Sequence, residues 1–157
     1  MLRRLLRLFA RRPPPPPPRP TDPRLAQDPW LAALFAQLGE RYQLEPSGTR
    51  VLRRTGRARF NPMAVWIEGR VVRGEYEVRG AGEREAVAAQ ARALLDARIA
   101  APLAQLGLAQ RSESVEEWAG TVLTRRYEGA FDDAQRAAEV VRYFCEESEQ
   151  QLNLAAE

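Results

Sequence analysis

The sequence contains no histidine and no lysine, so all 24 of its basic residues are arginine. Arginine stays protonated at every working pH, which excludes acid–base catalysis by histidine or lysine and Schiff-base chemistry by lysine. The single cysteine, Cys145, excludes an intramolecular disulfide and a cysteine metal cluster, which fits a reducing compartment. We therefore expect a protein that is not an enzyme and that uses no cofactor or metal; a hydrolytic enzyme stays open as an alternative.

The positive charge is concentrated at the start of the chain. At 157 residues and 45% hydrophobic composition, the chain is long and apolar enough for one folded domain with appendages. Its first 20 residues hold six arginines and no acid, whereas the remaining 137 residues hold 18 arginines against 21 acids. A basic protein usually binds nucleic acid or an anionic membrane. Here that inference applies to the leader, because the body is mildly acidic.

Residues 1–12 form a leader with the pattern of a basic amphipathic helix. Its apolar residues recur at i, i+3, i+4 and i+7, the spacing of one helix face that lies in a membrane interface. The segment is too short to span a bilayer and lacks the cleavage site of a secretory signal. A solvated tail, a cleavable presequence, and contact with nucleic acid or an acidic protein groove stay open. The residues expected to contact a membrane or another anionic surface are Leu2, Arg3, Arg4, Leu5, Leu6, Arg7, Phe9, Arg11 and Arg12.

A proline-rich linker over residues 13–27 separates the leader from the body. Pro13–Pro18 and Pro20 favour a polyproline II rod, which would hold the leader about 25 Å from the body. Such a run can also be a ligand for an aromatic groove. We expect a single domain over residues 28–152 and a frayed C-terminus over residues 153–157.

The body reads as an α+β domain. Asp28 and Pro29 begin a helix whose apolar stripe extends to Tyr42 and which ends at residues 45–48. A second helix over residues 83–106 is expected to be kinked or split by Pro102 and ended by Gly107. Asp132 is predicted to cap the last helix. Strands are expected over residues 49–54, 57–60, 63–67, 70–80 and 116–131, and a hairpin folded at residues 119–120 is an alternative for the last of them.

These elements predict an antiparallel β-sheet of about four to five strands packed with about three helices, in the order α-β-β-β-α-β(β)-α. The clearest strand is residues 70–80. Val72, Tyr76 and Val78 occupy one of its faces, while charged residues occupy the other. The leader and linker are expected to be disordered, or to fold only on a surface or partner.

An arginine-rich hairpin is the second candidate site. Residues 41–79 carry nine arginines against four acids, and the last 78 residues carry eight against fourteen. Arginines interleaved with aromatic residues suit single-stranded nucleic acid. Neutralisation of this hairpin by the acidic C-terminal half stays open beside that interpretation. The residues that would contact nucleic acid are Arg50, Arg53, Arg54, Arg57 and Arg59.

Three smaller features have structural interpretations. Glu75 and Glu77 lie on the same face of one strand, as carboxylates do in some metal-dependent nucleases. Their flanking arginines favour a solvent-facing ladder of charges instead. Cys145 is expected to be a buried, inert thiol on the last helix. The three tryptophans, Trp30, Trp66 and Trp118, are expected in or against the core.

The C-terminal part carries a resemblance to a known fold. Within Gly120–Leu152, a strand runs into a capped helix that contains Val141-Arg142-Tyr143-Phe144 and then Glu146-Glu147-Ser148. With the element order over residues 28–152, this resembles the type III secretion chaperone-like fold, which includes the YbjN-type proteins. The resemblance implies a non-enzymatic domain that binds protein partners and often pairs with itself. The leader is not part of that family's pattern.

The sequence therefore favours a non-enzymatic interaction domain, adaptor or chaperone-like, tethered to an anionic surface by its leader. The expected partners are another protein, a second copy in a homodimer, and an anionic membrane contacted peripherally. We expect a cytoplasmic protein, with contact at the inner membrane face. The alternative is a nucleic-acid-binding protein that uses the leader together with the Arg50–Arg59 hairpin.

Overall fold

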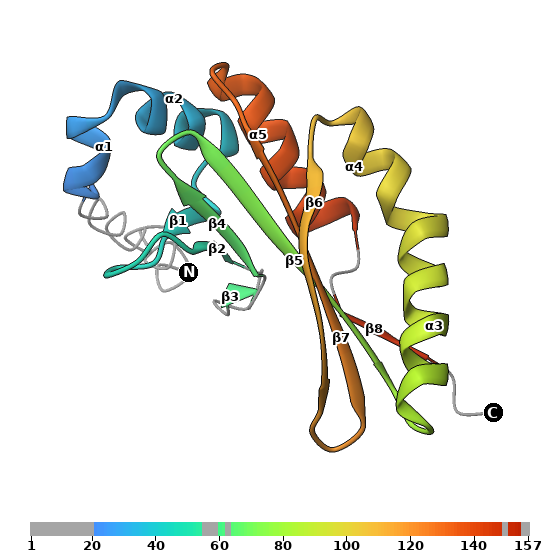
Figure 1. Ribbon diagram of the computed structural model, residues 1–157. Helices are drawn as coiled ribbons and strands as arrows, with labels where there is room; N and C mark the ends of the chain where they lie inside the picture. The colour runs from blue at the N-terminus through green and yellow to red at the C-terminus, as the bar shows by residue number, and fades with distance from the viewer. Residues whose placement is uncertain (1–20, 55–59, 62–63, 149–150, 155–157) are drawn as a thin grey trace, which may run out of the picture.

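The computed structural model describes residues 21–54, 60–61, 64–148 and 151–154, and over these the chain is an α+β protein, as predicted (Figure 1). The leader, Arg57 and Arg59 lie outside the described residues. The helices are α1 (Pro23–Gln27), α2 (Pro29–Leu38), α3 (Arg84–Leu95), α4 (Ala101–Gln105) and α5 (Ala134–Arg142), with π-helical segments η1 (Asp96–Ala100) and η2 (Tyr143–Glu147). The strands are β1 (Tyr42–Leu44), β2 (Val51–Arg54), β3 (Phe60–Asn61), β4 (Val65–Glu68), β5 (Val71–Gly80), β6 (Ala109–Glu117), β7 (Thr121–Ala130) and β8 (Gln151–Asn153).

The strands form two sheets. The main sheet has the order β4-β5-β7-β6 with antiparallel pairs, and β8 joins it in parallel to β5. β4 pairs with residues 71–74 of β5 and β8 pairs with residues 77–79, so the two short strands share one edge of the long one. The smaller sheet is β1-β2-β3. The strand at 151–153 is an element that the sequence did not predict.

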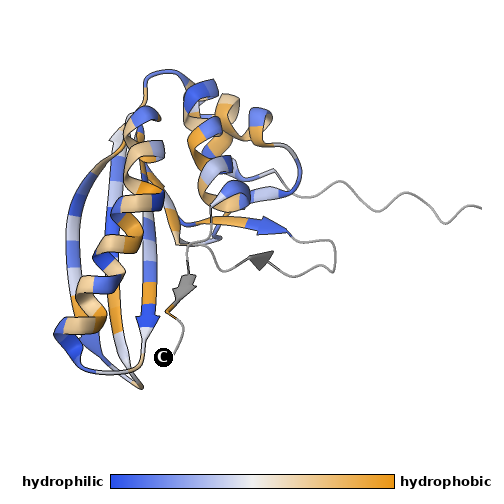
Figure 2. Cartoon of the chain, turned by 90° about the vertical axis from the view of Figure 1, so that its right-hand side faces the viewer, coloured by the Kyte–Doolittle hydropathy of each residue, from blue (hydrophilic) through white to orange (hydrophobic). Residues whose placement is uncertain are grey.

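Helices cover one face of the main sheet. Figure 2 shows α3, η1 and α4 as one long column along the strands, with α2 and α5 in a second helical group. Val72, Tyr76 and Val78 are fully buried on the helix side of β5, which confirms the predicted alternation. The hydrophobic core and the residues packed against it come from residues 25–154.

The first long helix begins where predicted and ends earlier. The Asp28 side chain accepts hydrogen bonds from the backbone N–H groups of Trp30 and Leu31, at 3.0 and 3.1 Å, and Pro29 takes the first helical position. The prediction that the helix reaches Tyr42 is wrong. Gly39 adopts a φ of +86°, which ends α2 and turns the chain into β1. Tyr42 is buried from that strand instead.

The second long helix is split, as predicted for a helix that contains Pro102. The α-helical hydrogen bonding of α3 gives way to the π-helical segment η1 just before the proline, and α4 continues to Gln105. Proline has no N–H to donate into the preceding turn, so a regular ladder cannot pass through it. Gly107, with a φ of +90°, follows the end of α4 as predicted.

The predicted hairpin at residues 119–120 is present, and its first strand is longer than expected. β6 begins at Ala109 rather than at Glu116, with a register shift between Gln110 and Ser112. The expectation that Trp118 lies in or against the core is wrong, because this side chain is 77% exposed at the turn. Trp30 is buried as expected.

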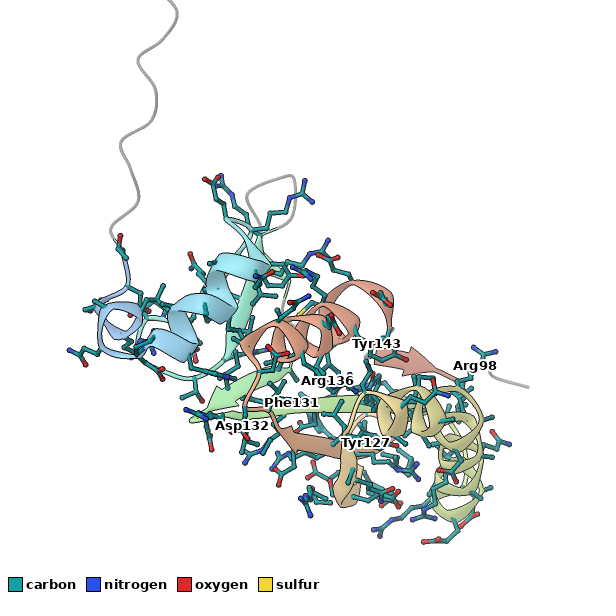
Figure 3. The ribbon with its side chains drawn as sticks, turned by 90° about the horizontal axis from the view of Figure 1, so that it is seen from above. Arg98, Tyr127, Phe131, Asp132, Arg136 and Tyr143 are labelled. Atoms are coloured by element: carbon teal, nitrogen blue, oxygen red, sulfur yellow. The ribbon has the colours of Figure 1, made fainter. Side chains whose placement is uncertain are left out.

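The cap of the last helix lies one residue later than predicted. Asp133, not Asp132, accepts a hydrogen bond from the backbone N–H of Gln135, at 2.9 Å. Asp132, at the junction of β7 and α5 (Figure 3), instead pairs with Arg70 at 2.8 Å. Cys145 is buried as expected, and burial raises the pKa of its thiol to about 12.

Arginine side chains join the elements by donating to backbone carbonyls. Three of the accepting carbonyls lie in the last turn of α2, α4 or η2, where helix carbonyls have no partner within the helix and where the helix dipole favours a cation. Figure 3 shows Arg136 between α5 and α4, consistent with its bond to α4. The donors and acceptors are Arg24 to Glu45 and Gly48, Arg53 to Cys145, Arg84 to Val115, Arg136 to Gln105, and Arg142 to Gln37.

Candidate functional site

The first described residues show where the leader leaves the body. α1 buries none of its residues, yet it is tied to the turn at residues 45–48 by Arg24. Arg24 also forms an ion pair with Asp22 at 2.6 Å, and this hydrogen-bonded pair lowers the pKa of the Asp22 carboxyl. The predicted linker over residues 13–27 therefore ends in a helix that is docked beside β1 and β2. The leader residues themselves lie outside the described residues.

The arginine-rich hairpin is partly engaged by the acidic C-terminal region. Arg53 donates from Nη1 to the carbonyl of Cys145 at 3.0 Å, and its Nε lies 3.6 Å from Glu146 Oε1. Tyr42 donates to the same Glu146 oxygen at 2.6 Å. Arg54 is exposed, and the backbone of Arg50 bridges to Trp66. Arg53 is thus held by the end of η2, which leaves Arg54 as an exposed arginine of this set.

Of the two glutamates considered for metal chemistry, Glu75 belongs to a ladder of ion pairs, and Glu77 is half-buried on the same face of β5. Glu75 pairs with Arg126 at 2.5 Å across β5 and β7, and Arg126 lies 5.8 Å from the ring centre of Trp66. Arg73 pairs in the same way with Glu128 at 3.2 Å. For Glu75 these contacts show a charge pair across strands on the face without helices, as the ladder predicted, although its side chain is only 16% exposed rather than fully solvent-facing. Among the described residues, no group of three or more histidine, cysteine or acidic side chains is arranged to hold a metal ion.

A charged cluster on the helix side of the sheet was missed by sequence reasoning. Arg125 is 3% exposed on β7 and lies between Glu113 of β6, at 2.8 Å, and Asp96 of η1, at 2.5 Å. Arg92 of α3 also binds Glu113, at 2.7 Å. The signal was present, because Arg125 shares the strand parity of Leu123, which faces the core. The cluster joins α3, η1, β6 and β7 and is structural.

Glu113 is expected to make stability depend on pH. Burial alone would raise its pKa, but hydrogen bonds from Arg92 and Arg125 hold the pKa below its ordinary value of 4.5. Its contribution is therefore present above about pH 4.5 and lost as the pH falls below that value. Glu113→Gln should lower the unfolding free energy at about pH 6, and its difference from the natural chain should shrink towards about pH 3.

Urea unfolding at several pH values tests this expectation. The matched control is Glu116→Gln, which removes an exposed carboxylate from the same strand. A difference that stays constant over the whole pH range would show that Glu113 does not carry the dependence.

The β6–β7 hairpin tip is the most distinctive surface feature. Trp118 is 77% exposed, and its backbone N–H donates to the carbonyl of Gly120 at 2.8 Å. Ala119 adopts a φ of +50°, which is uncommon for alanine. A shallow hollow of about 260 Å³ lies beside the indole, lined by the tip and by Gly82 of the turn between β5 and α3. A large apolar side chain is thus presented to solvent by a tight turn.

No helix in the part of the chain that the structure describes is long and apolar enough to cross a membrane. Comparison with known proteins finds no matching family model, no matching curated protein and no matching solved structure. The resemblance to the type III secretion chaperone-like fold therefore stays a prediction.

Proposed function

We propose that this chain is a non-enzymatic protein-interaction domain, adaptor or chaperone-like, that its leader tethers to an anionic surface. The observation that carries the proposal is the contrast in how the arginines are used. Arginines of the body pair with acids of the body, as Arg73, Arg125 and Arg126 do. The six arginines of residues 1–20 have no acid within that stretch of sequence. An anionic surface would supply the negative charge that this stretch lacks.

An anionic membrane matches both the apolar face and the arginines of the leader, whereas a partner that offers negative charge alone matches only the arginines. Leu2, Leu5, Leu6 and Phe9 share one helical face and would enter the apolar boundary, while the arginines contact phosphates. Each arginine near such a surface contributes about 1 kcal/mol, in a salt-dependent way. The exposed Trp118 supports a protein-interaction role for the body, because tryptophan is enriched among the residues that dominate binding at protein interfaces.

The leader's role can be tested by co-sedimentation of the full chain with anionic and neutral vesicles. Replacing Arg3, Arg4 and Arg7 with glutamine removes about 3 kcal/mol of attraction and should weaken anionic vesicle binding about a hundredfold. The matched control replaces three exposed arginines of the body, Arg70, Arg98 and Arg111, and changes the net charge equally. Equal weakening in the two triple variants would overturn the proposal.

A parallel measurement with single-stranded DNA tests the alternative. Exposure of Arg54 keeps a nucleic-acid face open, whereas the contacts of Arg53 with Glu146 and the Cys145 carbonyl count against it. DNA binding that is lost in the Arg53→Gln, Arg54→Gln variant and retained in the leader variant would replace the proposal with nucleic-acid binding.

A further inference from the structure

The β6–β7 hairpin tip has the composition of a site for a basic, partly apolar segment. Trp118 supplies an exposed aromatic face, and Glu116 and Glu117 precede it with exposed carboxylates. The first turn of α3, which follows Gly82, carries Glu85, also exposed. Among the described residues, none of these three carboxylates forms an ion pair. Arginine over an indole face, beside a carboxylate, gains both cation–π and charge attraction.

The tip is held in position rather than left as a loose loop. Arg84 at the start of α3 donates to the carbonyl of Val115 on β6 at 3.1 Å. Gly120 packs closely on β5, because a Cβ at this position would lie 3.0 Å from the carbonyl oxygen of Gly80. The hollow of about 260 Å³ beside Trp118 is bounded by the tip and by Gly82. A ligand would therefore meet a preformed surface, which reduces the entropy cost of binding.

We propose that this tip binds the arginine-rich leader, residues 1–12, of a second copy of the chain. The leader combines arginines with Leu2, Leu5, Leu6 and Phe9, which matches an exposed tryptophan that follows two exposed carboxylates. Since the chain has no lysine, arginine is the side-chain cation that it can offer to this site. The contact does not require the proposed tethering to a membrane, although both use the same leader.

The geometry favours a second copy over the leader of the same chain. Figure 1 shows α1 beyond one end of the main sheet and the hairpin tip at the other end. The ten residues of β5 alone span about 33 Å between these ends. The proline run of the sequence favours a rod of about 25 Å, which is shorter than this span, so the leader of the same chain would have to fold back along its own sheet to reach the tip. A leader-to-tip contact between copies joins two different surfaces and so extends into rings or chains.

Sedimentation velocity of the full chain at increasing concentration is the test. We expect self-association in the natural chain, weakened about tenfold or more by Trp118→Ser and measurably by Glu117→Gln. Glu139→Gln removes an exposed carboxylate from α5, away from the tip, and is the matched control that should change nothing. Trp118 is exposed, so its replacement should leave the thermal unfolding of the domain unchanged.

A second measurement identifies the occupant. A chain that starts at Thr21 keeps every described core residue, and the peptide of residues 1–12 can be added to it. The peptide should shift the indole N–H resonance of Trp118 and leave that of Trp30 in place. No self-association of the natural chain, or self-association that Trp118→Ser leaves unchanged, would overturn the proposal. So would a leader-dependent Trp118 shift in a chain that stays monomeric, because the contact would then lie within one copy.

Failure of this proposal is distinguishable from failure of surface tethering. Trp118→Ser should bind anionic vesicles at least as well as the natural chain does, because it frees the leader from the tip, whereas the Arg3, Arg4 and Arg7 variant should lose both vesicle binding and self-association.

Discussion

Replacing Gly74 with valine is expected to lower the free energy of unfolding by about 3 kcal/mol or more. Gly74 faces the helices from β5, and a Cβ built there would lie 2.2, 2.3 and 2.6 Å from three ring atoms of Phe144. Phe144 is fully buried and packs 5.8 Å from the ring of Tyr76, so it has no free space to enter. In the absence of a clash, valine would stabilise a strand relative to glycine. A loss of stability in Gly74→Val would therefore show that the clash with Phe144 outweighs the strand preference of valine.

Urea unfolding followed by circular dichroism measures this change. Glu77→Val places the same side chain on the opposite face of β5 and should alter the unfolding free energy by less than about 0.5 kcal/mol. Combining Gly74→Val with Phe144→Ala should cost less than the sum of the two single changes, because the removed ring vacates the space. An unfolding midpoint for Gly74→Val equal to that of the natural chain would contradict the packing described here.

Replacing Arg125 with methionine is expected to cost about 3 kcal/mol. Arg125 is the buried cation between Glu113 and Asp96, and its loss leaves Glu113 with Arg92 alone. The Glu113 side chain is 19% exposed, so water compensates only in part for the missing partner. Asp96, with a 64% exposed side chain, contributes little to the loss.

An ion pair that is exposed on both sides provides the control. Arg70→Met removes the pair with Asp132, in which the two side chains are 59% and 95% exposed, and should cost less than about 1 kcal/mol. Adding Glu113→Leu to Arg125→Met should restore most of the lost stability, because no unpaired carboxylate then remains. Equal costs for Arg125→Met and Arg70→Met, measured by urea unfolding, would show that burial of the pair is unimportant.

Local sequence patterns predicted those helices and strands whose ends and buried faces are set by residues close together in the sequence. The alternation over residues 70–80 predicted the longest strand together with its buried face, and Asp28 with Pro29 predicted the start of α2. The end of α2 was misplaced because the apolar spacing continues to Tyr42, although Gly39 had already turned the chain. Helical spacing alone does not show whether an apolar residue such as Tyr42 belongs to the next turn of the helix or to a buried strand that follows the helix.

The candidate sites were predictable only in part, because pairing across strands is a tertiary property. The ladder around Glu75 followed from its flanking arginines, but which arginine pairs with it depends on the register of β5 and β7. Arg125 was missed since an arginine on a core face is costly unless acids from other elements meet it. Trp118 was assigned to the core because apolar character predicts burial, whereas its place at a hairpin turn exposes it.

By itself, the sequence determined the composition-level properties of this protein: a basic leader, a proline-rich linker and an α+β body without histidine or lysine. It also determined the starts of α2 and α3 and the buried face of β5. These follow from residue type and short spacing. Only the tertiary structure decided that Arg53 meets Glu146, that Arg125 is buried between two carboxylates, and that Trp118 is exposed. The first two findings depend on contacts between residues far apart in the chain, and the third depends on where a turn projects. Strand register and helix docking determine these contacts and the position of the turn.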